Sequence, residues 1–374
     1  MKKKFFITLF CIFASFCLVS SSIVYLTYLS KDTTFAKILS TPQTKYTHWV
    51  AIEPDFTPDF YYSKDAVRIG NNVLLFQSDS GGWNKNIHMD AKFNIFEKIY
   101  IIYDKSLRDA PTIDNTATTT EIDYLSKLYN ATHKKKYKKA VIRGLKYLLK
   151  MQLDNGGFPQ SFPFIQHEYQ KYITFNDCAM VNVLSLFYKI IDKDPQYDFI
   201  KSHLRKKIKK SFDKGLQCLL KTQLPVGGWA SQYNHITMEP ANARTYELAA
   251  VDSRETANAI IFLVKIKNPS ENILQSIEKA VKWLNENKIE NFQFAYHIND
   301  DGLKDFKLDK CQNCPPIWAR LYDLSTNTPI FSDRSGKKYE NIEEISYERR
   351  NNYEWYVIDG RLALEEYQAW KALK

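Results

Sequence analysis

A seven-residue pattern, Q-x3-G-G-aromatic, occurs three times and decides how this chain folds. It reads QSDSGGW at 77–83, QLDNGGF at 152–158 and QLPVGGW at 223–229. The glutamines are 75 and 71 residues apart, and two copies also match upstream, as GLKYLLKMQ and GLQCLLKTQ. Three copies at a nearly constant interval indicate a repeat architecture.

Each copy predicts two helices separated by a long loop. An apolar stripe leads into the glycine pair, and glycine with a positive φ commonly ends a helix. One such stripe consists of Val141, Leu145, Leu148 and Leu149. A second helix then follows an N-capping residue. The second helices are predicted to begin near Thr118, Asn176 and Ser253.

Helical hairpins of this size cannot bury their apolar faces alone, so we expect three of them to pack side by side around a common axis over about 61–286. A further helix is predicted from Ser270 to Asn285, and loops and short strands over about 287–374. The three long loops then gather on one face with the N-termini of the second helices, which favour anionic ligands.

The N-terminus indicates export. Three lysines, Lys2 to Lys4, precede an uncharged and mostly apolar run from Phe5 to Leu29. Residues 1–30 therefore read either as a cleaved signal peptide or as an uncleaved anchor, because the run is long enough to span a bilayer. We expect a secreted or periplasmic protein, membrane-anchored through residues 5–29 if that segment is kept, with a linker over 31–60 before a domain at 61–374.

The formal net charge of +10 has two interpretations. Lysines on solvated helix faces explain part of it, and a positive field that attracts a polyanion is the alternative. Nucleic acid and acidic glycans are both polyanions, so charge alone does not choose between them.

The pair Cys311 and Cys314 forms a lone CxxC motif. A structural zinc site would need two more ligands nearby, and the sequence offers none. In an oxidising compartment a local disulfide and two free thiols both remain open.

The polar residues of the long loops are the candidates for chemistry. The loops contain TIDN at 112–115, TFND at 174–177 and PANARTYE at 240–247. Carboxylates and amides suit a hard cation with oxygen ligands, and arginine suits a carboxylate. Each residue alone has a structural explanation as an N-cap, a turn residue or half of an ion pair. Their recurrence at equivalent points of a repeat makes them candidates.

These loops and their surroundings resemble the family 10 pectate lyases, from about Tyr61 to Trp370. The matching stretches are NNVLLFQSDSGGWNKNIHMD, TIDNTATTTEIDYLSKLY, GLKYLLKMQLDNGGFPQSFP, ITFNDCAMVNVL, GLQCLLKTQ, PANARTYEL, PPIWARLYDLSTNTPIFSDRSG and EISYERRNNYEWY. The resemblance implies a mainly α fold, a partial (α/α)3 toroid of three helical hairpins with an additional loop and short-strand C-terminal region. It also implies calcium-dependent β-elimination on α-1,4-polygalacturonate, which gives unsaturated oligogalacturonides.

The resemblance assigns a role to each matching residue. Asp114 and Asp177 would hold Ca²⁺, and Arg244 would be the catalytic base. The substrate would be bound by Lys85, Asn115, Arg320 and Arg334. The expected partner is polygalacturonate or pectin rather than nucleic acid, and we expect a monomer.

The chemistry is consistent with this set of residues. Removing the proton at C5 of galacturonate builds negative charge beside a carboxylate, and a cation with arginines stabilises it. The base role of Arg244 rests on the resemblance alone, because a free guanidinium has a pKa above about 12.

Three departures from the family pattern bear on activity. Thr116 replaces a glycine after TIDN, Cys178 replaces an aspartate after TFND, and Asp252 lies where the family has a serine-glycine stretch. We expect activity to survive, and a pectin-binding relative without turnover is the alternative. A helical-ring terpene cyclase is a second alternative, but the sequence lacks its DDxxD and DxDD motifs.

Overall fold

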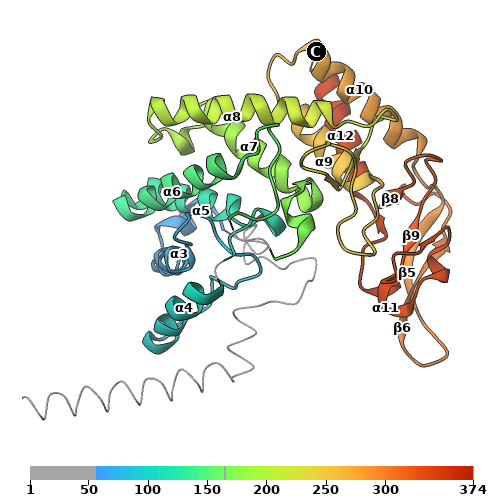
Figure 1. The fold of residues 1–374 in the computed structure, drawn as a ribbon, viewed down its shortest axis with the longest axis horizontal. Helices are drawn as coiled ribbons and strands as arrows, with labels where there is room; N and C mark the ends of the chain where they lie inside the picture. Colours follow the sequence, from blue (N-terminus) through green and yellow to red (C-terminus); the bar gives the residue numbers. More distant parts are fainter. Residues whose placement is uncertain (1–55, 109, 164–165, 374) are drawn as a thin grey trace, which may run out of the picture. The chain divides into compact units, whose positions relative to one another are not determined.

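The computed structural model describes residues 56–108, 110–163 and 166–373. It is mainly α-helical (Figure 1), with short strands in small antiparallel sheets and no closed sheet among these residues. The predicted mainly α fold class is confirmed. The chain divides into two compact units, residues 1–145 and 146–374, with the boundary inside one helix. The two units are described separately.

The first unit is built around two helices that pack on each other, α3 (Lys64–Phe76) and α5 (Thr119–Thr132). The side-chain oxygen of Ser63 caps α3 by accepting from the backbone N–H of Ala66 at 3.0 Å. The unit also contains η2 (Pro58–Tyr62), α4 (Ile95–Arg108), η3 (Asp114–Thr116) and the first part of α6 (Lys135–Met151).

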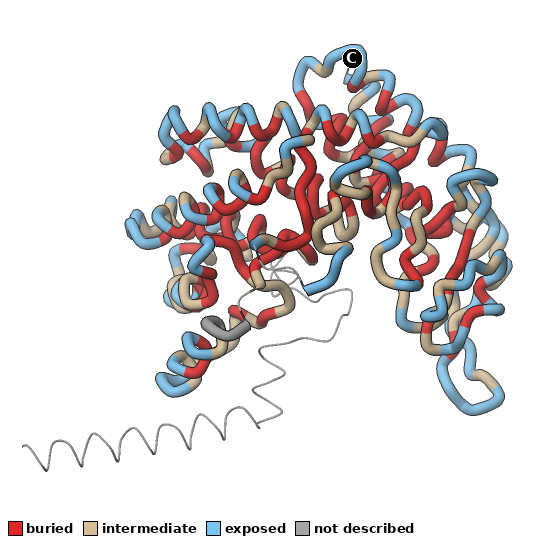
Figure 2. Tube along the Cα trace, viewed as in Figure 1, coloured by how far each residue is buried: buried red, intermediate tan, exposed pale blue. Residues whose placement is uncertain are grey.

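The second unit contains the remaining helices. They are α7 (Ala179–Ile191), α8 (Ser202–Lys221), α9 (Ser253–Leu263), α10 (Glu271–Glu286), α11 (Tyr347–Asn351) and α12 (Asp359–Ala372), with η4 (Glu168–Lys171), η5 (Asn176–Cys178), η6 (Pro195–Tyr197) and η7 (Ile342–Glu344). Along the longer helices buried and exposed positions alternate with the helical period (Figure 2), as expected for amphipathic helices.

Most strands of the second unit are two residues long, and two strands are seven residues long. One sheet has three strands in the order β2-β4-β8, namely β2 (Trp229–Ala230), β4 (Val251–Asp252) and β8 (Leu321–Tyr322). Four pairs complete the set: β1 (Ile173–Thr174) with β3 (Gln232–Tyr233), β7 (Trp318–Ala319) with β11 (Tyr356–Val357), β9 (Phe331–Ser332) with β10 (Lys338–Tyr339), and β5 (Phe292–Ile298) with β6 (Lys304–Lys310). β4 therefore joins the loop after α8 to the loop that contains Arg320.

The glutamine of the seven-residue pattern holds each turn to the next helix. Its side-chain amide donates to the first glycine carbonyl of its own turn and to a carbonyl in the following helix. The pairs of acceptors are Gly81 at 2.8 Å and Ala140 at 2.9 Å for Gln77, Gly156 and Ser211, both at 2.9 Å, for Gln152, and Gly227 at 2.6 Å and Ser276 at 2.9 Å for Gln223. The repeated motif is thus the joint between successive repeats.

The aromatic residue after the glycines is a core residue in all three copies of the pattern. Trp83, Phe158 and Trp229 are fully buried. The indole N–H of Trp83 donates to the Val73 carbonyl at 2.7 Å, and that of Trp229 donates to Leu219 at 2.8 Å. These bonds fasten the turn to the helix that precedes it.

A fourth helical hairpin of the same kind follows the three predicted hairpins. The indole N–H of Trp318 donates to the Leu284 carbonyl at 2.8 Å, in α10, and the second helix is α12, which packs on α9. The region 287–374, for which the sequence predicts loops and short strands, therefore also contains helices. Sequence analysis misses α12 because no glutamine-glycine motif precedes it and few of its residues are buried, among them Ala363 and Tyr367.

Two predictions about the periphery have different outcomes. Cys311 and Cys314 are joined by a disulfide, which is one of the two options left open. Residues 1–30 and most of the predicted linker lie outside the described residues. Among the helices that the structure describes, none is both long and apolar enough to cross a membrane.

Candidate active site

The TFND loop of the second unit forms a tight turn with an unusual backbone. Asp177 (φ 53°) and Cys178 (φ 60°) are successive left-handed residues immediately before α7. The Asn176 amide donates to the Asp177 carboxylate at 2.8 Å, and the Ser231 carbonyl accepts from the backbone N–H of Phe175 and Asn176. Asp177 is thereby fixed at the start of a helix.

The TIDN loop of the first unit has the same backbone with the acid and the amide exchanged. Asn115 (φ 48°) and Thr116 (φ 63°) are the two left-handed residues here. The family glycine would adopt this conformation without strain, whereas a β-branched residue with positive φ is rare and costly. The departure at Thr116 therefore puts strain into the turn beside Asp114.

The structure brings the predicted residues of the first unit together. Asp114 is buried and forms an ion pair with Lys85, and the Asn115 amide donates to the Asn86 side chain at 2.8 Å. Lys85 and Asn86 come from the loop that follows the first seven-residue motif.

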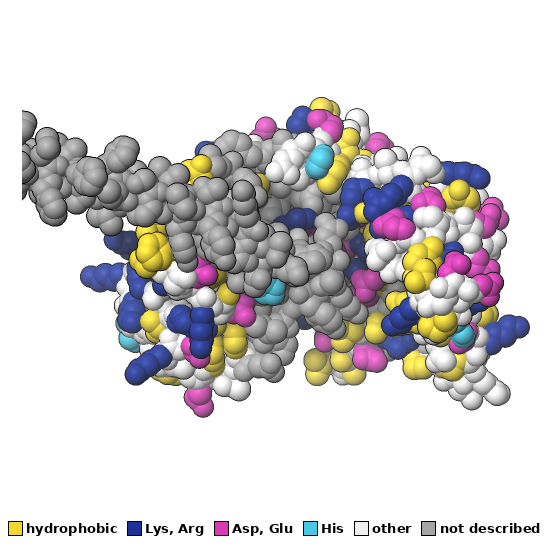
Figure 3. Space-filling model, turned by 90° about the horizontal axis from the view of Figure 1, so that it is seen from below, with side chains coloured by type: hydrophobic (Ala, Val, Ile, Leu, Met, Phe, Trp, Pro, Cys, Tyr) yellow, Lys and Arg dark blue, Asp and Glu magenta, His cyan; other side chains and the backbone are white. Residues whose placement is uncertain are grey.

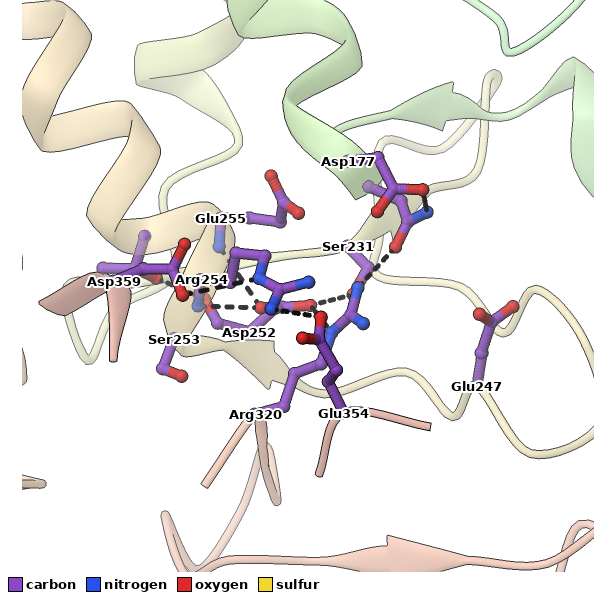
Figure 4. A network of polar contacts seen from close by, with 12 residues as sticks. Asp177, Ser231, Glu247, Asp252, Ser253, Arg254, Glu255, Arg320, Glu354 and Asp359 are labelled. Carbon is purple, nitrogen blue, oxygen red and sulfur yellow. Dashed lines mark hydrogen bonds and ion pairs between the residues drawn. The ribbon is translucent and has the colours of Figure 1, made fainter. Parts of the chain in front are cut away.

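Arg320 lies inside the second unit, between two loops (Figure 4). Its guanidinium donates to the Asn176 side-chain oxygen at 2.8 Å and to Asp252 at 3.3 Å, and it stacks over the ring of Tyr353. Only 5% of the residue is exposed. Burial alone would lower the pKa of Arg320, but Tyr353, Asp252 and other acidic neighbours raise it well above its ordinary value. Arg320 is therefore a permanent cation.

Asp252, at the third departure from the family pattern, is an organising residue. It is fully buried and caps α9 by accepting from the backbone N–H groups of Arg254 at 2.9 Å and Glu255 at 3.2 Å. Its second oxygen accepts from the Ser231 hydroxyl at 2.7 Å and from Arg320. Asp252 thus joins the start of α9 to the loop that holds Arg320.

Glu255 lies in the first turn of α9 and is also fully buried. One carboxylate oxygen accepts from the backbone N–H of Cys178 at 3.2 Å, while the other has no hydrogen-bond partner among the described residues. Burial, followed by the charge of Asp252, raises the pKa of Glu255 well above its ordinary value.

Arg244 is held by Glu247 in the PANARTYE loop. Its Nε donates to the Glu247 carboxylate at 2.8 Å and its Nη2 donates to the other oxygen, while the backbone N–H of Glu247 donates to the Arg244 carbonyl. Burial alone would lower the pKa of Arg244, but the hydrogen bonds and charge of Glu247 outweigh it and raise this pKa above its ordinary value.

Three guanidinium groups surround the ring of Tyr246. Arg244, Arg334 and Arg349 lie 5.0, 5.6 and 4.3 Å from the ring centre. Glu348 pairs with both Arg334 and Arg349, and these hydrogen bonds lower the pKa of Glu348 to about 2. The cluster combines cation–π contacts with a surplus of positive charge.

A shallow depression connects these elements of the second unit. It is lined by Asn176, Ser231, Gln232, Ala241, Ala243, Glu247 and Leu248. Asn176 bonds to Asp177, and Glu247 bonds to Arg244. The turn of Asp177 and the loop of Arg244 therefore border the same surface.

Comparison with known proteins assigns the family. Residues 77–363, which are most of the chain, match the family model described as pectic acid lyase. This chain belongs to the pectic acid lyase family. It is therefore a polysaccharide lyase. No curated protein is significantly similar to it in sequence.

Two solved structures of a family 10 polysaccharide lyase from Cellvibrio cellulosa resemble this pectic acid lyase. Both have a TM-score of 0.71 and 27% sequence identity over 83% of this chain, and the match covers 95% and 94% of the solved chains. One of them is a mutant in complex with trigalacturonic acid.

The donor chemistry of two loops in this chain fits a hard cation. Asp177 with Asn176 in the second unit and Asp114 with Asn115 in the first offer carboxylate and amide oxygens, which calcium prefers. Within the described residues, no three His, Cys, Asp or Glu side chains form a group that could hold a metal ion.

Sequence reasoning missed three residues of this site. Asp252 was noted only as a departure, and Glu255 and Arg349 were given no role. Arg349 lies in the matching stretch EISYERRNNYEWY, and that stretch was the available signal. Glu255 carried none, because its partner Cys178 is 77 residues away.

On the visible atoms of Figure 3, lysine and arginine side chains are interspersed with acidic ones rather than gathered in a single patch.

Proposed function

We propose that this polysaccharide lyase cleaves α-1,4-polygalacturonate by calcium-dependent β-elimination. The observation that carries the proposal is the depression bordered by the Asp177 turn and the Arg244 loop, with a cluster of guanidiniums beside it. Such a surface offers an oxygen ligand and cations to a chain of uronate groups. A similar family 10 lyase was solved with trigalacturonic acid, and we extend that ligand class to this chain.

The reaction needs a base and a means of stabilising charge, and it needs no attacking water molecule. Arg244 takes the proton from C5. The electron pair of the broken C5–H bond then forms the C4–C5 double bond, and the bond between C4 and the glycosidic oxygen breaks. The departing oxygen is protonated by solvent. A bound calcium ion would neutralise the uronate carboxylate and stabilise the negative charge that develops on it.

The proposed roles are those that the resemblance implies, and the positions of the side chains support them. Asp177, in the second unit, and Asp114, in the first, are the proposed calcium ligands. Arg334, whose side chain is 62% exposed, is proposed to bind a uronate carboxylate, as a guanidinium fork suits that group. Arg320 is proposed to bind substrate from its position beside Asn176.

The first unit would add substrate contacts of its own. Lys85 and Asn115 lie beside Asp114 and are proposed to bind the glycan together with that carboxylate.

Export of the chain through residues 1–30, with or without cleavage, completes the proposal, because its substrate is an extracellular polysaccharide.

Substituting Arg244 tests the base. Arg244→Ala should lower kcat for elimination by at least about 10³-fold, since the proton acceptor is lost. Polygalacturonate binding, measured by affinity electrophoresis, should weaken by less than about tenfold because the other arginines remain. Turnover close to wild type would remove Arg244 from the mechanism.

Substituting Asp177 tests the cation. Asp177→Ala should raise the calcium concentration that gives half-maximal activity by at least about tenfold, because one charged oxygen ligand is lost. The matched control is Asp213→Ala, which removes an exposed carboxylate of α8 paired with Lys209. An unchanged calcium response in the Asp177 variant would place the ion elsewhere.

A further inference from the structure

We propose that Glu255 is a positioning residue that holds the Asp177 turn in the conformation that the reaction needs. It does so through a closed circuit of hydrogen bonds that leaves the turn at the backbone of Cys178 and returns to it at the side chain of Asn176. Figure 4 shows Glu255, Asp252 and Arg320 of this circuit together with Asp177. The inference rests on the role proposed above for Asp177.

The turn needs external support because its backbone is strained. Asp177 tolerates a left-handed conformation fairly well, whereas the same conformation is energetically unfavourable for Cys178. Such conformations persist only where surrounding contacts determine them. The contacts that do so here are the two ends of the circuit.

The first arm of the circuit runs from the turn to α9. The backbone N–H of Cys178 donates to the Glu255 carboxylate at 3.2 Å. The backbone N–H of Glu255 in turn donates to Asp252 at 3.2 Å. Because Glu255 and Asp252 are both fully buried, this arm is shielded from water and its bonds are stronger than they would be at the surface.

The second arm returns from Asp252 to the turn. The other oxygen of Asp252 accepts from Arg320 at 3.3 Å, and Arg320 donates to the Asn176 side-chain oxygen at 2.8 Å. The Asn176 amide then donates to the Asp177 carboxylate at 2.8 Å. Glu255 therefore fixes the backbone of the turn, while Arg320 and Asn176 orient the carboxylate of Asp177.

A purely structural role does not account for Glu255. Its second oxygen is buried without a hydrogen-bond partner among the described residues, and burying such a group is costly. It is not needed as a helix cap, because Asp252 already caps α9. Its neighbour Arg254 is taken up by Glu354 at 2.6 Å and Asp359 at 3.6 Å. A buried polar atom with such an energetic cost is typical of a functional site.

The test compares Glu255→Ala with Glu255→Gln in the full chain. Both remove the ionisable carboxyl group, but the glutamine oxygen still accepts from Cys178. The alanine variant should raise the calcium concentration for half-maximal elimination at least about tenfold, and the glutamine variant less than about threefold. The control Glu354→Gln disturbs the partner of Arg254 outside the circuit and should leave the calcium response unchanged.

A second readout does not depend on activity. Iodoacetamide alkylation of Cys178, followed by peptide mass, should be several-fold faster in the alanine variant than in the glutamine variant, because only the former releases the turn. Buried Cys218 reports on unfolding and should stay unreactive in both. Equal alkylation of Cys178 in the two variants, with Cys218 protected, would overturn the proposal. A wild-type chain without lyase product would instead count against the proposed function, and alkylation would still test the positioning.

Discussion

Arg244 must satisfy two conflicting demands. A base must be able to lose its proton, yet the carboxylate of Glu247 holds Arg244 in its charged form and raises its pKa above the ordinary value. Removing the partner of an ion pair withdraws this support for the charged form. Glu247 should therefore set how alkaline the medium must be before Arg244 accepts a proton.

Glu247→Gln should shift the pH dependence of elimination. Without the carboxylate the pKa of Arg244 falls, so a larger fraction is neutral at any given pH, and the rising limb of kcat against pH moves toward lower pH. We expect a shift of about one pH unit, because a single close opposite charge moves a pKa by roughly that amount. The measurement is initial rate against pH at saturating calcium. A rising limb at the wild-type pH, or at a higher one, would contradict the proposed base.

The departures from the family pattern do not have equal consequences. Asp252 is built into the site as a cap of α9 and a partner of Arg320. Thr116 and Cys178 instead adopt left-handed backbone conformations, which are energetically unfavourable for residues other than glycine. At the level of single residues, the sequence identifies where the departures lie, and their effects depend on backbone angles that no pattern reports.

At the level of elements, the glutamine-glycine joint is the feature that repeats. At Gly156 the φ of 92° and the neighbouring Lys214 carbonyl leave no room for a β-carbon. The same holds at Gly227 against Lys279. The glycines are therefore required by two independent constraints, the backbone angle and the close approach of the next helix.

Gly156→Ala should destabilise the protein by about 3 kcal/mol or more, because strain and a clash with the backbone add. The matched control is Gly302→Ala in the β5–β6 turn, where φ is 74° and nothing lies within 4 Å of the added carbon. The control has only the conformational penalty and should cost about 1 kcal/mol. Urea unfolding followed by circular dichroism measures both. Equal losses would show that the close approach to Lys214 is unimportant.

The elements that the sequence predicts are those marked by local pattern. Helices before the glycine pairs carry an apolar stripe, and residues of capping type lie near the starts of the second helices, so α5, α7 and α9 are all predicted. Of these three helices only α9 has a side-chain cap, which Asp252 provides. α4 and α12 are not predicted, since neither adjoins the repeated motif. Several short strands exist only through partners far along the chain, as in the pairing of β4 with β8.

For the molecule as a whole, the sequence predicted the family and part of the site. Neighbours within one loop were predictable, such as Asn176 and Asp177. The partner of Asn176 was not, because Arg320 lies 144 residues away in sequence and only the folded chain brings them together. The same applies to Arg349, which meets Tyr246 across a comparable separation.

The whole protein should cleave its substrate by elimination rather than hydrolysis, and the absorbance of the product tests this most directly. The full chain is incubated with de-esterified polygalacturonate, with calcium, after chelation, and after calcium is restored. We predict ultraviolet absorbance from the unsaturated product that appears with calcium, disappears on chelation and returns with the ion. Reducing ends released without that absorbance, or no product at any calcium concentration, would contradict the account.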